Sequence, residues 1–562
     1  MKTTINKIFT GVLLGFCGLA AVSCTNLDET LYDTISSEQH QMTDEELQHT
    51  IAPVYSSLRH VYWDWFGMSD IMDMSSDVWG VPSRIGIGWG DLYVPMHKHD
   101  FNSQMGFFQV NWDTNYAGVN ACNKILANEA IVSNNEAIVS NKEIKVQVRA
   151  YRALYYYNLF DLYRNIPLDT TYVHEAGWTP EQEDPQKTFN WIERELKEVA
   201  DQCPDKVEMG KINKWAAHMI LAKLYLNHNA WFKDDTDKSW YQKSIDEINK
   251  VIVGPFKLAP TYSTNFMEDI SSSPEIIFGI PLENKYAGGN YMANLWTHNA
   301  GRARWNFSGW ATGGGIVFPQ FLDIYEEGDK RMDNTWTGGQ QYAMDGSPIL
   351  VDGEPLVYTK ELHSIDNPGC YPFESYRLIK YEIKSGDFGT SYDDVPYYRL
   401  ADAYMMKAEC LLRLGQDEQT AADLVSQVRA RDFDDPAKAK VTVEYLKGGS
   451  KYDYGHRENQ GKMGEADKWI VTHEGGADIE FGGLLDEYAR EFVCEAHRRD
   501  ELIRFNIKGT NQNVYNGKSW FCKDAVLDPN DRHCDLFPIP KSAMDGNPKL
   551  KQNPGYASST TK

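Results

Sequence analysis

The stretch KVQVRAYRALYYYNLFDLY, residues 145–163, carries apolar residues at a spacing of three and four positions. Val146, Ala150 and Tyr157 thereby fall on one face, which predicts an amphipathic helix with alanine at its tightest contact. Pro167 follows and is expected to stop the helix, because proline lacks the N–H that a helix needs.

Helices of the same style recur in pairs along the chain. Residues 215–232, WAAHMILAKLYLNHNAWF, are followed by 241–252, and residues 400–415 are followed by 421–428. Paired amphipathic helices with alanine at the crossing are typical of tetratricopeptide-like repeats, in which each pair stacks on the next. The predicted fold class is therefore mainly α, a tetratricopeptide-like helical-repeat scaffold with pairs at about 140–254 and 398–507.

Residues 484–505, LLDEYAREFVCEAHRRDELIRF, predict one further long helix. Arg498 and Arg499 follow Glu491 and Glu495 at helical spacing, so we expect ion pairs within this helix. The expected role of these charges is structural.

The scaffold is interrupted by segments with little helical period. Residues 255–396 are rich in glycine and aromatic residues, and so many residues cannot form a plain loop in a compact domain. We expect an irregular, loop-rich ligand-binding layer, built from about 255–396 together with about 60–115, on a single domain that spans 24–562.

The N-terminal residues predict a targeting signal. Lys2 and Lys7 precede a short apolar run that ends in small residues, LAAVSC, at Cys24. This pattern predicts a lipoprotein signal peptide, residues 1–23, with a lipid-bearing Cys24 as the first mature residue. Ordinary secretion is the alternative, because residues 21–23 also fit a small-residue cleavage site. The residues after Cys24 leave open which side of the membrane the anchor faces.

Charge and motifs exclude several classes of function. The formal net charge of −24 argues against nucleic-acid partners. The chain has no GxSxG and no HExxH motif, so we expect no catalytic residues, no enzyme activity and no cofactor. His97-Lys98-His99 lacks a third ligand, is expected to be an exposed loop, and predicts no metal site. Among the cysteines, Cys522 with Cys534 is the most favoured local disulfide.

Nine of the sixteen tryptophans fall in the two irregular segments. A sugar ring has an apolar face and a rim of hydroxyls, so it docks on an aromatic plate while polar groups bond the rim. Glycine-rich stretches such as residues 288–315 can lift such plates out of a core. Trp63 and Trp65 lie beside a predicted helix and are expected to pack against it.

Several motifs, in order, resemble the SusD/RagB family of outer-membrane lipoproteins. They are RALYYYNLFDLYRNIPL, WAAHMILAKLYLNHNAW, PEIIFGIP, YYRLADAYMMKAECLLRLG, VRARD, EYAREFVCEAHRRDELIRFN and LFPIPKSAMDGNPKLKQNPGY. The resemblance implies a non-catalytic protein that is lipid-anchored to the outer membrane and faces the cell exterior. It also implies capture of oligosaccharides or polysaccharides for a SusC-like TonB-dependent transporter. Capture of peptides or another nutrient, and a structural transporter lid without ligand contact, remain alternatives.

The resemblance also implies where a glycan would bind. It places stacking residues at Trp310, in NFSGW, and at Tyr291, after Gly288-Gly289. The expected glycan-binding residues are Trp310, Tyr291, Trp89, Arg84, Asp77, Trp296 and Trp305. Arg84, Lys98, Arg302 and Arg304 lie in or beside these loops, which favours either an acidic sugar or pairing with acids of the loops.

Overall fold

The computed structural model describes residues 44–63, 65–83, 90–128, 139–283, 289, 291–309, 311–366, 373–386, 391–459 and 469–557. Gln48–Lys562 forms one compact unit. Of the other unit, Met1–Leu47, only the first turn of a helix is described, so Cys24 lies outside the described residues. None of the helices in the described part is both long and apolar enough to cross a membrane.

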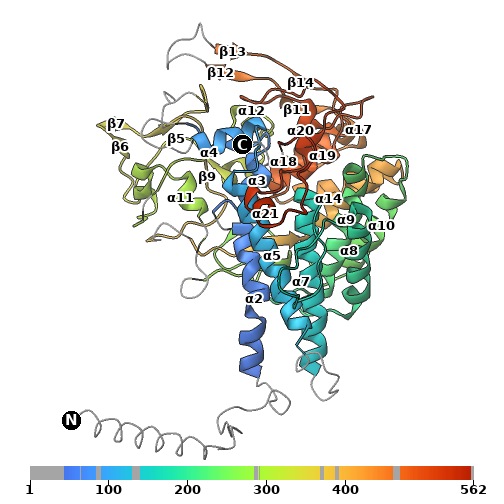
Figure 1. Ribbon diagram of the computed structural model, residues 1–562. Helices are drawn as coiled ribbons and strands as arrows, with labels where there is room; N and C mark the ends of the chain where they lie inside the picture. Colours follow the sequence, from blue (N-terminus) through green and yellow to red (C-terminus); the bar gives the residue numbers. More distant parts are fainter. Residues whose placement is uncertain are drawn as a thin grey trace, which may run out of the picture. The chain divides into compact units, whose positions relative to one another are not determined.

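The predicted helix pairs are confirmed. Helix α7 (Val139–Tyr163) packs on α8 (Pro185–Val199), and α9 (Lys214–Phe232) packs on α10 (Ser239–Ile252). Helix α14 (Leu400–Leu414) packs on α10 as well as on its own partner α15 (Glu418–Arg429). The two groups of pairs, far apart in sequence, therefore stack directly and form one continuous scaffold (Figure 1).

The ends of these helices follow from local chemistry. Asp184 caps α8 by accepting a hydrogen bond from the N–H of Lys187, and Pro185 occupies the first helical position. Asn213 caps α9 in the same way. Gly415 ends α14 with φ 64°, a conformation that glycine adopts without strain.

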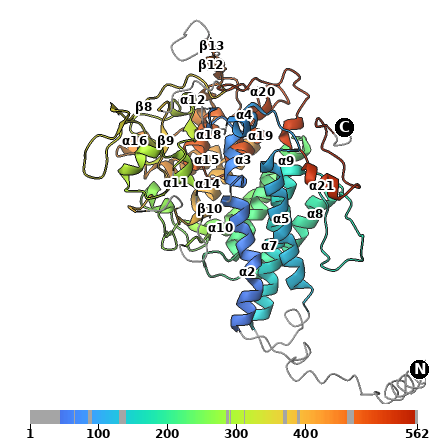
Figure 2. The ribbon, with the colours of Figure 1, turned by 60° about the vertical axis from the view of Figure 1, so that its left-hand side comes forward.

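Further helices extend the scaffold on its N-terminal side. Helices α2 (Asp44–Trp63) and α5 (Gly106–Leu126) run beside α7 (Figure 2). A Cβ at Gly118 of α5 would lie 2.5 Å from Cζ of Tyr155, so the α5–α7 contact depends on glycine. The elements between α2 and α5 are α3 (Met68–Met74), β1 (Trp79–Gly80) and α4 (Gly90–Lys98).

The segment 484–505 differs from its prediction, because it forms two helices. Helix α18 (Gly482–Phe492) ends before Cys494 and Ala496, which have φ of 58° and 60°, and α19 (Arg498–Arg504) follows. The expected pairs within one helix are replaced by pairs with distant residues. Glu491 and Glu495 both bind Arg399, at 2.6 and 2.8 Å.

A buried ionic network joins this segment to the rest of the molecule. Arg399 ends strand β10 (Val395–Arg399), and it and Glu491 are fully buried. A buried charge is tolerated only when it is paired and hydrogen-bonded, so these contacts hold β10 against α18. The other pairs of the network include Arg331–Asp329, Arg331–Glu487, Arg429–Glu487, Arg431–Glu491, Arg431–Glu275, Arg490–Glu487 and Lys380–Glu495.

The residues from 255 to 396 form the expected irregular layer of short elements. Its five-residue strand β2 (Ile276–Ile280) pairs antiparallel with β10. The others are η2 (Tyr262–Phe266), α11 (Met292–Trp296), η3 (Asn299–Arg304), β3 (Ile316–Val317), α12 (Pro319–Leu322), α13 (Lys330–Thr335), β4 (Trp336–Thr337), β5 (Gly339–Gln340), β6 (Leu350–Val351), β7 (Glu354–Pro355), β8 (Val357–Tyr358) and β9 (Arg377–Leu378). Every strand pair in the described ranges is an antiparallel two-stranded sheet.

The C-terminal part adds short elements around α18 and α19. They are α16 (Pro436–Ala439), α17 (Val443–Lys447), β11 (Ser450–Asp453), β12 (Arg457–Asn459), β13 (Trp469–Val471), β14 (Gly475–Gly476), α20 (Val514–Gly517), η5 (His533–Asp535) and α21 (Lys541–Gly546), with η1 (Ala200–Gln202) following α8. Cys522 and Cys534 are buried and unpaired, so the disulfide prediction is wrong. Cys522 packs in an apolar cluster with Phe318 and Phe521 instead.

His97 is buried within α4 and His99 is half-buried just after it, so the prediction of an exposed loop is wrong. Nε2 of His97 accepts a hydrogen bond from the N–H of Cys522 at 3.2 Å, and Nε2 of His99 lies 2.8 Å from the carbonyl of Ser75. Burial lowers the pKa of both rings well below the usual value, which favours neutral imidazoles. Each ring thus serves to connect α4 with the layer around it.

Candidate functional site

An aromatic pair lies where the two irregular segments meet. Trp65 follows the end of α2, Tyr291 directly precedes α11, and their rings make an edge-to-face contact at 5.5 Å and 82°. Both side chains are half-buried, so part of each ring faces solvent. The sequence predicted Tyr291 as a binding residue but assigned Trp65 to packing, and the structure places them together.

The pair borders a shallow hollow that has polar groups on one side. Asp70 lies in its lining and accepts a hydrogen bond from the N–H of Phe66 at 3.1 Å. Tyr93 lines it as well, and burial raises the pKa of its hydroxyl, which keeps it a neutral donor. Asp70 and Tyr93 are themselves buried, at 8% and 1% exposure, so the half-buried rings of Trp65 and Tyr291 are what this hollow presents to solvent. An exposed aromatic plate is the kind of surface on which a sugar face docks. The full lining is Trp65, Ser69, Asp70, Tyr93, Tyr291, Met292 and Leu295.

The backbone on both sides of position 310 is fixed near the same place. Nη1 of Arg302 donates to the carbonyl of Gly309 at 2.5 Å, and the N–H of Thr312 donates to the carbonyl of Asn294 at 3.0 Å. Asn294 lies in α11, a five-residue helix about 7.5 Å long that begins just after Tyr291. The residue that follows Ala311, Thr312, is therefore bonded to the helix that begins just after Tyr291. Trp310 itself lies outside the described residues, as do Trp89 and Arg84.

Trp305 is half-buried at the end of η3. The Cζ of Arg304 lies 4.9 Å from the centre of its ring, and the carbonyl of Trp305 accepts a hydrogen bond from Gly386 at 3.1 Å. This guanidinium–indole contact fixes the ring at the edge of the layer.

Lys98, Arg302 and Arg304, the described cations in or beside the predicted ligand loops, differ in their hydrogen-bond partners. Lys98 pairs with Asp366, as the acid-pairing alternative expects. Arg304 instead donates to Thr337 and Gln341, both neutral, and burial lowers its pKa. The hydrogen bonds of Arg302 go to backbone carbonyls.

Trp296 and Asp77 do not lie at this surface. Trp296 is fully buried between Trp79 and Trp336, with ring centres 5.0 and 5.7 Å away. Asp77 is fully buried and bound by Arg498. Both side chains are part of the core, so we leave them out of the proposed site. The tryptophan-rich segment 255–396 contains both buried and half-buried tryptophans, and its composition alone does not tell which of them are buried.

Comparisons with known proteins agree with the fold. Residues 261–556 match a family model described as the SusD family, and residues 32–226 match one described as starch-binding associating with outer membrane. The starch-binding protein SusD of Bacteroides thetaiotaomicron is 24% identical over 455 residues, which cover 73% of this chain and 72% of that protein.

Solved structures show the same architecture. Surface glycan-binding protein A from Bacteroides uniformis has a TM-score of 0.66 at 19% identity, covering 91% of this chain and 99% of that one. Surface glycan-binding protein A from Bacteroides thetaiotaomicron, in complex with laminarihexaose, has a TM-score of 0.66 at 17% identity, covering 91% and 100%. The predicted fold class is confirmed. The SusD family model matches more than half of the length of this chain, so the chain belongs to the SusD family.

Proposed function

We propose that the protein binds oligosaccharides or polysaccharides without catalysis, at a surface formed by Trp65, Tyr291, Trp305 and the loop of Trp310. The observation that carries the proposal is the contact between Trp65 and Tyr291. It brings together a ring from each irregular segment, beside Asp70 and Tyr93. The names of its relatives support a carbohydrate ligand, since they include a starch-binding protein and a protein in complex with laminarihexaose.

The expected affinity is modest. An aromatic contact contributes about 0.5–1.5 kcal/mol beyond its area, whereas a millimolar dissociation constant needs about 4.1 kcal/mol. Two or three plates with a few hydrogen bonds therefore give weak, reversible capture. Such binding suits a protein that hands its ligand to a partner.

We propose in addition that the protein is anchored to the outer membrane through Cys24, faces the cell exterior and delivers its ligand to a SusC-like TonB-dependent transporter. An anchor beside the transporter raises the local concentration of a weakly held glycan. The family description, starch-binding associating with outer membrane, supports this location.

Native gels that contain a soluble glucan test the binding proposal. Retardation of the wild-type protein, lost in Trp310→Ala, is the expected result. Equal retardation of both proteins would remove Trp310 from the site. A panel of glycans and peptides separates the alternatives, because binding of peptides alone would indicate another nutrient, and binding of neither would indicate a structural lid.

A further inference from the structure

A second group of side chains, away from the aromatic surface, brings together three cations, of which only Arg532 makes an ion pair with a residue that the structure describes. Arg164 follows the end of α7, Lys233 follows the end of α9, and Arg532 precedes η5. All three line a cavity of about 110 Å³, together with Asp161 and Asp535 among others. This clustering is notable in a chain with a net charge of −24.

Arg164 is a buried cation that forms no ion pair with any residue the structure describes. Its guanidinium lies 4.3 Å from the ring centre of Phe160 and 4.5 Å from that of Trp231. Its Nη1 is buried and has no hydrogen-bond acceptor within the described part of the chain. Burial lowers the pKa of Arg164 to about 9, and the nearby carboxylate of Asp161 offsets this only in part. An uncompensated buried charge destabilises a fold unless a ligand pairs with it.

Arg532 offers a second free donor at the same cavity. Its side chain is 9% exposed, and its Nε donates to Oδ2 of Asp535 at 2.7 Å. Its Nη2 is buried and has no acceptor among the described residues. Lys233 lies at the rim, adopts a left-handed backbone conformation with φ 55°, and makes no ion pair in the described ranges.

The two acids of the cavity have hydrogen-bond partners besides the three cations. Asp161 accepts a hydrogen bond from Nε1 of Trp231 at 3.0 Å and pairs with Arg499 at 3.4 Å. Oδ1 of Asp535 accepts hydrogen bonds from Asn513 and Asn516, at 2.9 and 2.5 Å. Nη1 of Arg164 and Nη2 of Arg532 are therefore left for a ligand.

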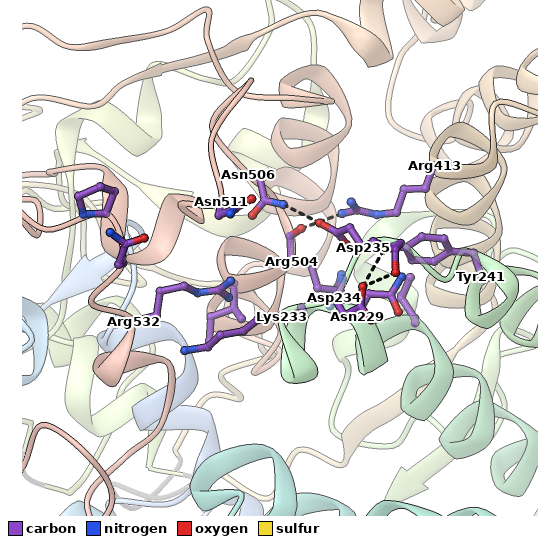
Figure 3. Close-up of a pocket in the computed structure, with 16 residues that line it drawn as sticks. Asn229, Lys233, Asp234, Asp235, Tyr241, Arg413, Arg504, Asn506, Asn511 and Arg532 are labelled. Carbon is purple, nitrogen blue, oxygen red and sulfur yellow. Dashed lines mark hydrogen bonds between the residues drawn. The ribbon is translucent and has the colours of Figure 1, made fainter. Parts of the chain in front are cut away.

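A larger cavity of about 430 Å³ shares Ala230, Lys233, Ile503 and Arg532 with the smaller one. Figure 3 shows Lys233 and Arg532 near each other, with Tyr241 and Arg413 toward the other side of the view. The lining of this cavity includes the carboxylates of Asp234 and Asp235 and several amides, which donate and accept hydrogen bonds and so suit hydroxyl groups. These amides are Asn229, Asn506, Asn511 and Asn530.

We propose that the smaller cavity binds an oxyanion group, of the sulfate, phosphate or carboxylate kind, between Arg164, Lys233 and Arg532. Arginine forks match the geometry of such oxyanions, and the bond would satisfy both orphaned guanidinium nitrogens. The source is either a free inorganic ion or an acidic substituent of a saccharide whose hydroxyls enter the larger cavity. This site shares no residue with the proposed aromatic surface and does not depend on it.

Isothermal titration with sodium sulfate, at constant ionic strength held with sodium chloride, tests the proposal. We expect saturable 1:1 binding that weakens at least tenfold, about 1.4 kcal/mol, in Arg164→Met and in Arg532→Gln. Met at position 164 keeps an apolar chain between Phe160 and Trp231. Lys206→Gln, at a lysine whose side chain is 76% exposed, serves as the control and should bind like wild type. Absence of binding of sulfate, phosphate and acetate, or unchanged binding in both arginine variants, would overturn the proposal.

Thermal unfolding distinguishes a lost site from a damaged fold. Without anion, Arg164→Met should unfold at the same temperature as wild type or higher, because it lacks an unpaired buried charge. Millimolar sulfate should raise the midpoint of wild type but not that of the variant, which separates site binding from the general effect of sulfate. A lower midpoint of Arg164→Met without anion would contradict the proposed site.

Two sources of the oxyanion give different results. The oxyanion belongs to a saccharide if glucose 6-sulfate or glucuronate binds at least tenfold more tightly than the matching free anion. In that case Asn506→Ala should remove the extra affinity of the sugar and leave the affinity for the free anion unchanged. If the free ion binds as tightly as the sugar, the ligand is the inorganic ion. Unsubstituted glucose serves as the uncharged comparison.

Discussion

Asp77 and Arg498 are joined by two parallel hydrogen bonds, 2.7 Å from Nε to Oδ1 and 2.8 Å from Nη2 to Oδ2. Both side chains are fully buried, and the pair connects the segment after α3 to the start of α19. A bidentate arginine–carboxylate pair fixes geometry as well as charge. A carboxylate that the sequence placed among ligand residues therefore holds two distant parts of the fold together.

Replacing one partner of this pair tests its structural role. Asp77→Asn should lower the free energy of unfolding by up to about 3–5 kcal/mol, because Arg498 would lose its bidentate carboxylate and keep only Glu501, 3.3 Å away, as a buried acidic partner. The exposed pair Lys330–Asp434 offers the control: Asp434→Asn, at a side chain 90% exposed, should change stability by less than about 1 kcal/mol. Urea denaturation measures both. A loss of glycan affinity in folded Asp77→Asn, without a loss of stability, would return Asp77 to the binding site.

The aromatic surface makes a second prediction. Tyr291→Ala and Trp65→Ala should each weaken glycan binding by about two- to tenfold, in line with the value of one aromatic contact. The double variant should lose less than the sum, because the two rings touch. Trp178→Ala is a matched control, since Trp178 is 45% exposed and stacks on His174 at 3.5 Å, in a different segment. Isothermal titration with an oligosaccharide gives the affinities, and a loss in Trp178→Ala equal to that in Tyr291→Ala would contradict the assignment.

Lys523 predicts a pH dependence of stability. Burial lowers its pKa to about 7, its ammonium lies 3.9 Å from the ring centre of Trp520, and the lysine is free to regain its ordinary pKa near 10.5 on unfolding. Between these values the unfolded chain holds a proton that the folded chain lacks, so this residue makes stability rise with pH by up to about 1.4 kcal/mol per unit. Below pH 7 the buried Lys523 is protonated in the folded protein, and its desolvated charge lowers the free energy of unfolding.

Lys523→Met should therefore be more stable than wild type at pH 6.5, by a margin that shrinks as the pH rises to 9.5. Urea denaturation at both values measures the difference, and Lys206→Met controls for the loss of an exposed lysine. A constant difference across this range would show that Lys523 keeps its ordinary pKa in the folded protein.

The close approach of α5 and α7 makes a prediction about packing. Gly118→Ala would place a Cβ 2.5 Å from the ring of Tyr155, and the resulting overpacking should cost about 1–3 kcal/mol. Gly546→Ala, in α21, meets no atom within 4 Å and should be neutral or slightly stabilising. Thermal unfolding of the two variants compares them directly, and equal midpoints would mean that the two helices can separate freely at this point.

Anchoring at Cys24 is tested in the producing cell. Cys24→Ala should release the protein from the detergent phase in phase partitioning, because the lipid attachment needs the thiol. Wild-type protein in the aqueous phase would favour ordinary secretion instead.

The scaffold could be predicted from the sequence because its signals are local. The apolar period of 145–163 and 215–232 is set by each helix alone, and α7 and α9 follow it. The break between α18 and α19 could not be predicted in this way. It depends on Glu495, whose partners Lys380 and Arg399 are brought near only by folding.

Glycine neighbours and the family resemblance indicated Tyr291 as a binding residue, and that role stays a prediction. The structure adds that its ring contacts Trp65. Trp79 and Trp296 also lie in segments rich in glycine and tryptophan, yet their rings are buried against each other. This burial is decided by tertiary contacts, which the local sequence does not show. The contact of Trp65 with Tyr291 and the cationic cavity could not be predicted from the sequence, because each joins residues that are distant along the chain.

Titration of the wild-type protein with a panel of neutral oligosaccharides, matched against peptides, tests the central claim most directly. We expect saturable heat with at least one oligosaccharide, at micromolar to millimolar affinity, and none with the same ligand in a Trp65→Ala, Tyr291→Ala, Trp310→Ala triple variant that remains folded. Binding of peptides alone, or undiminished glycan binding by the triple variant, would contradict glycan capture at this surface.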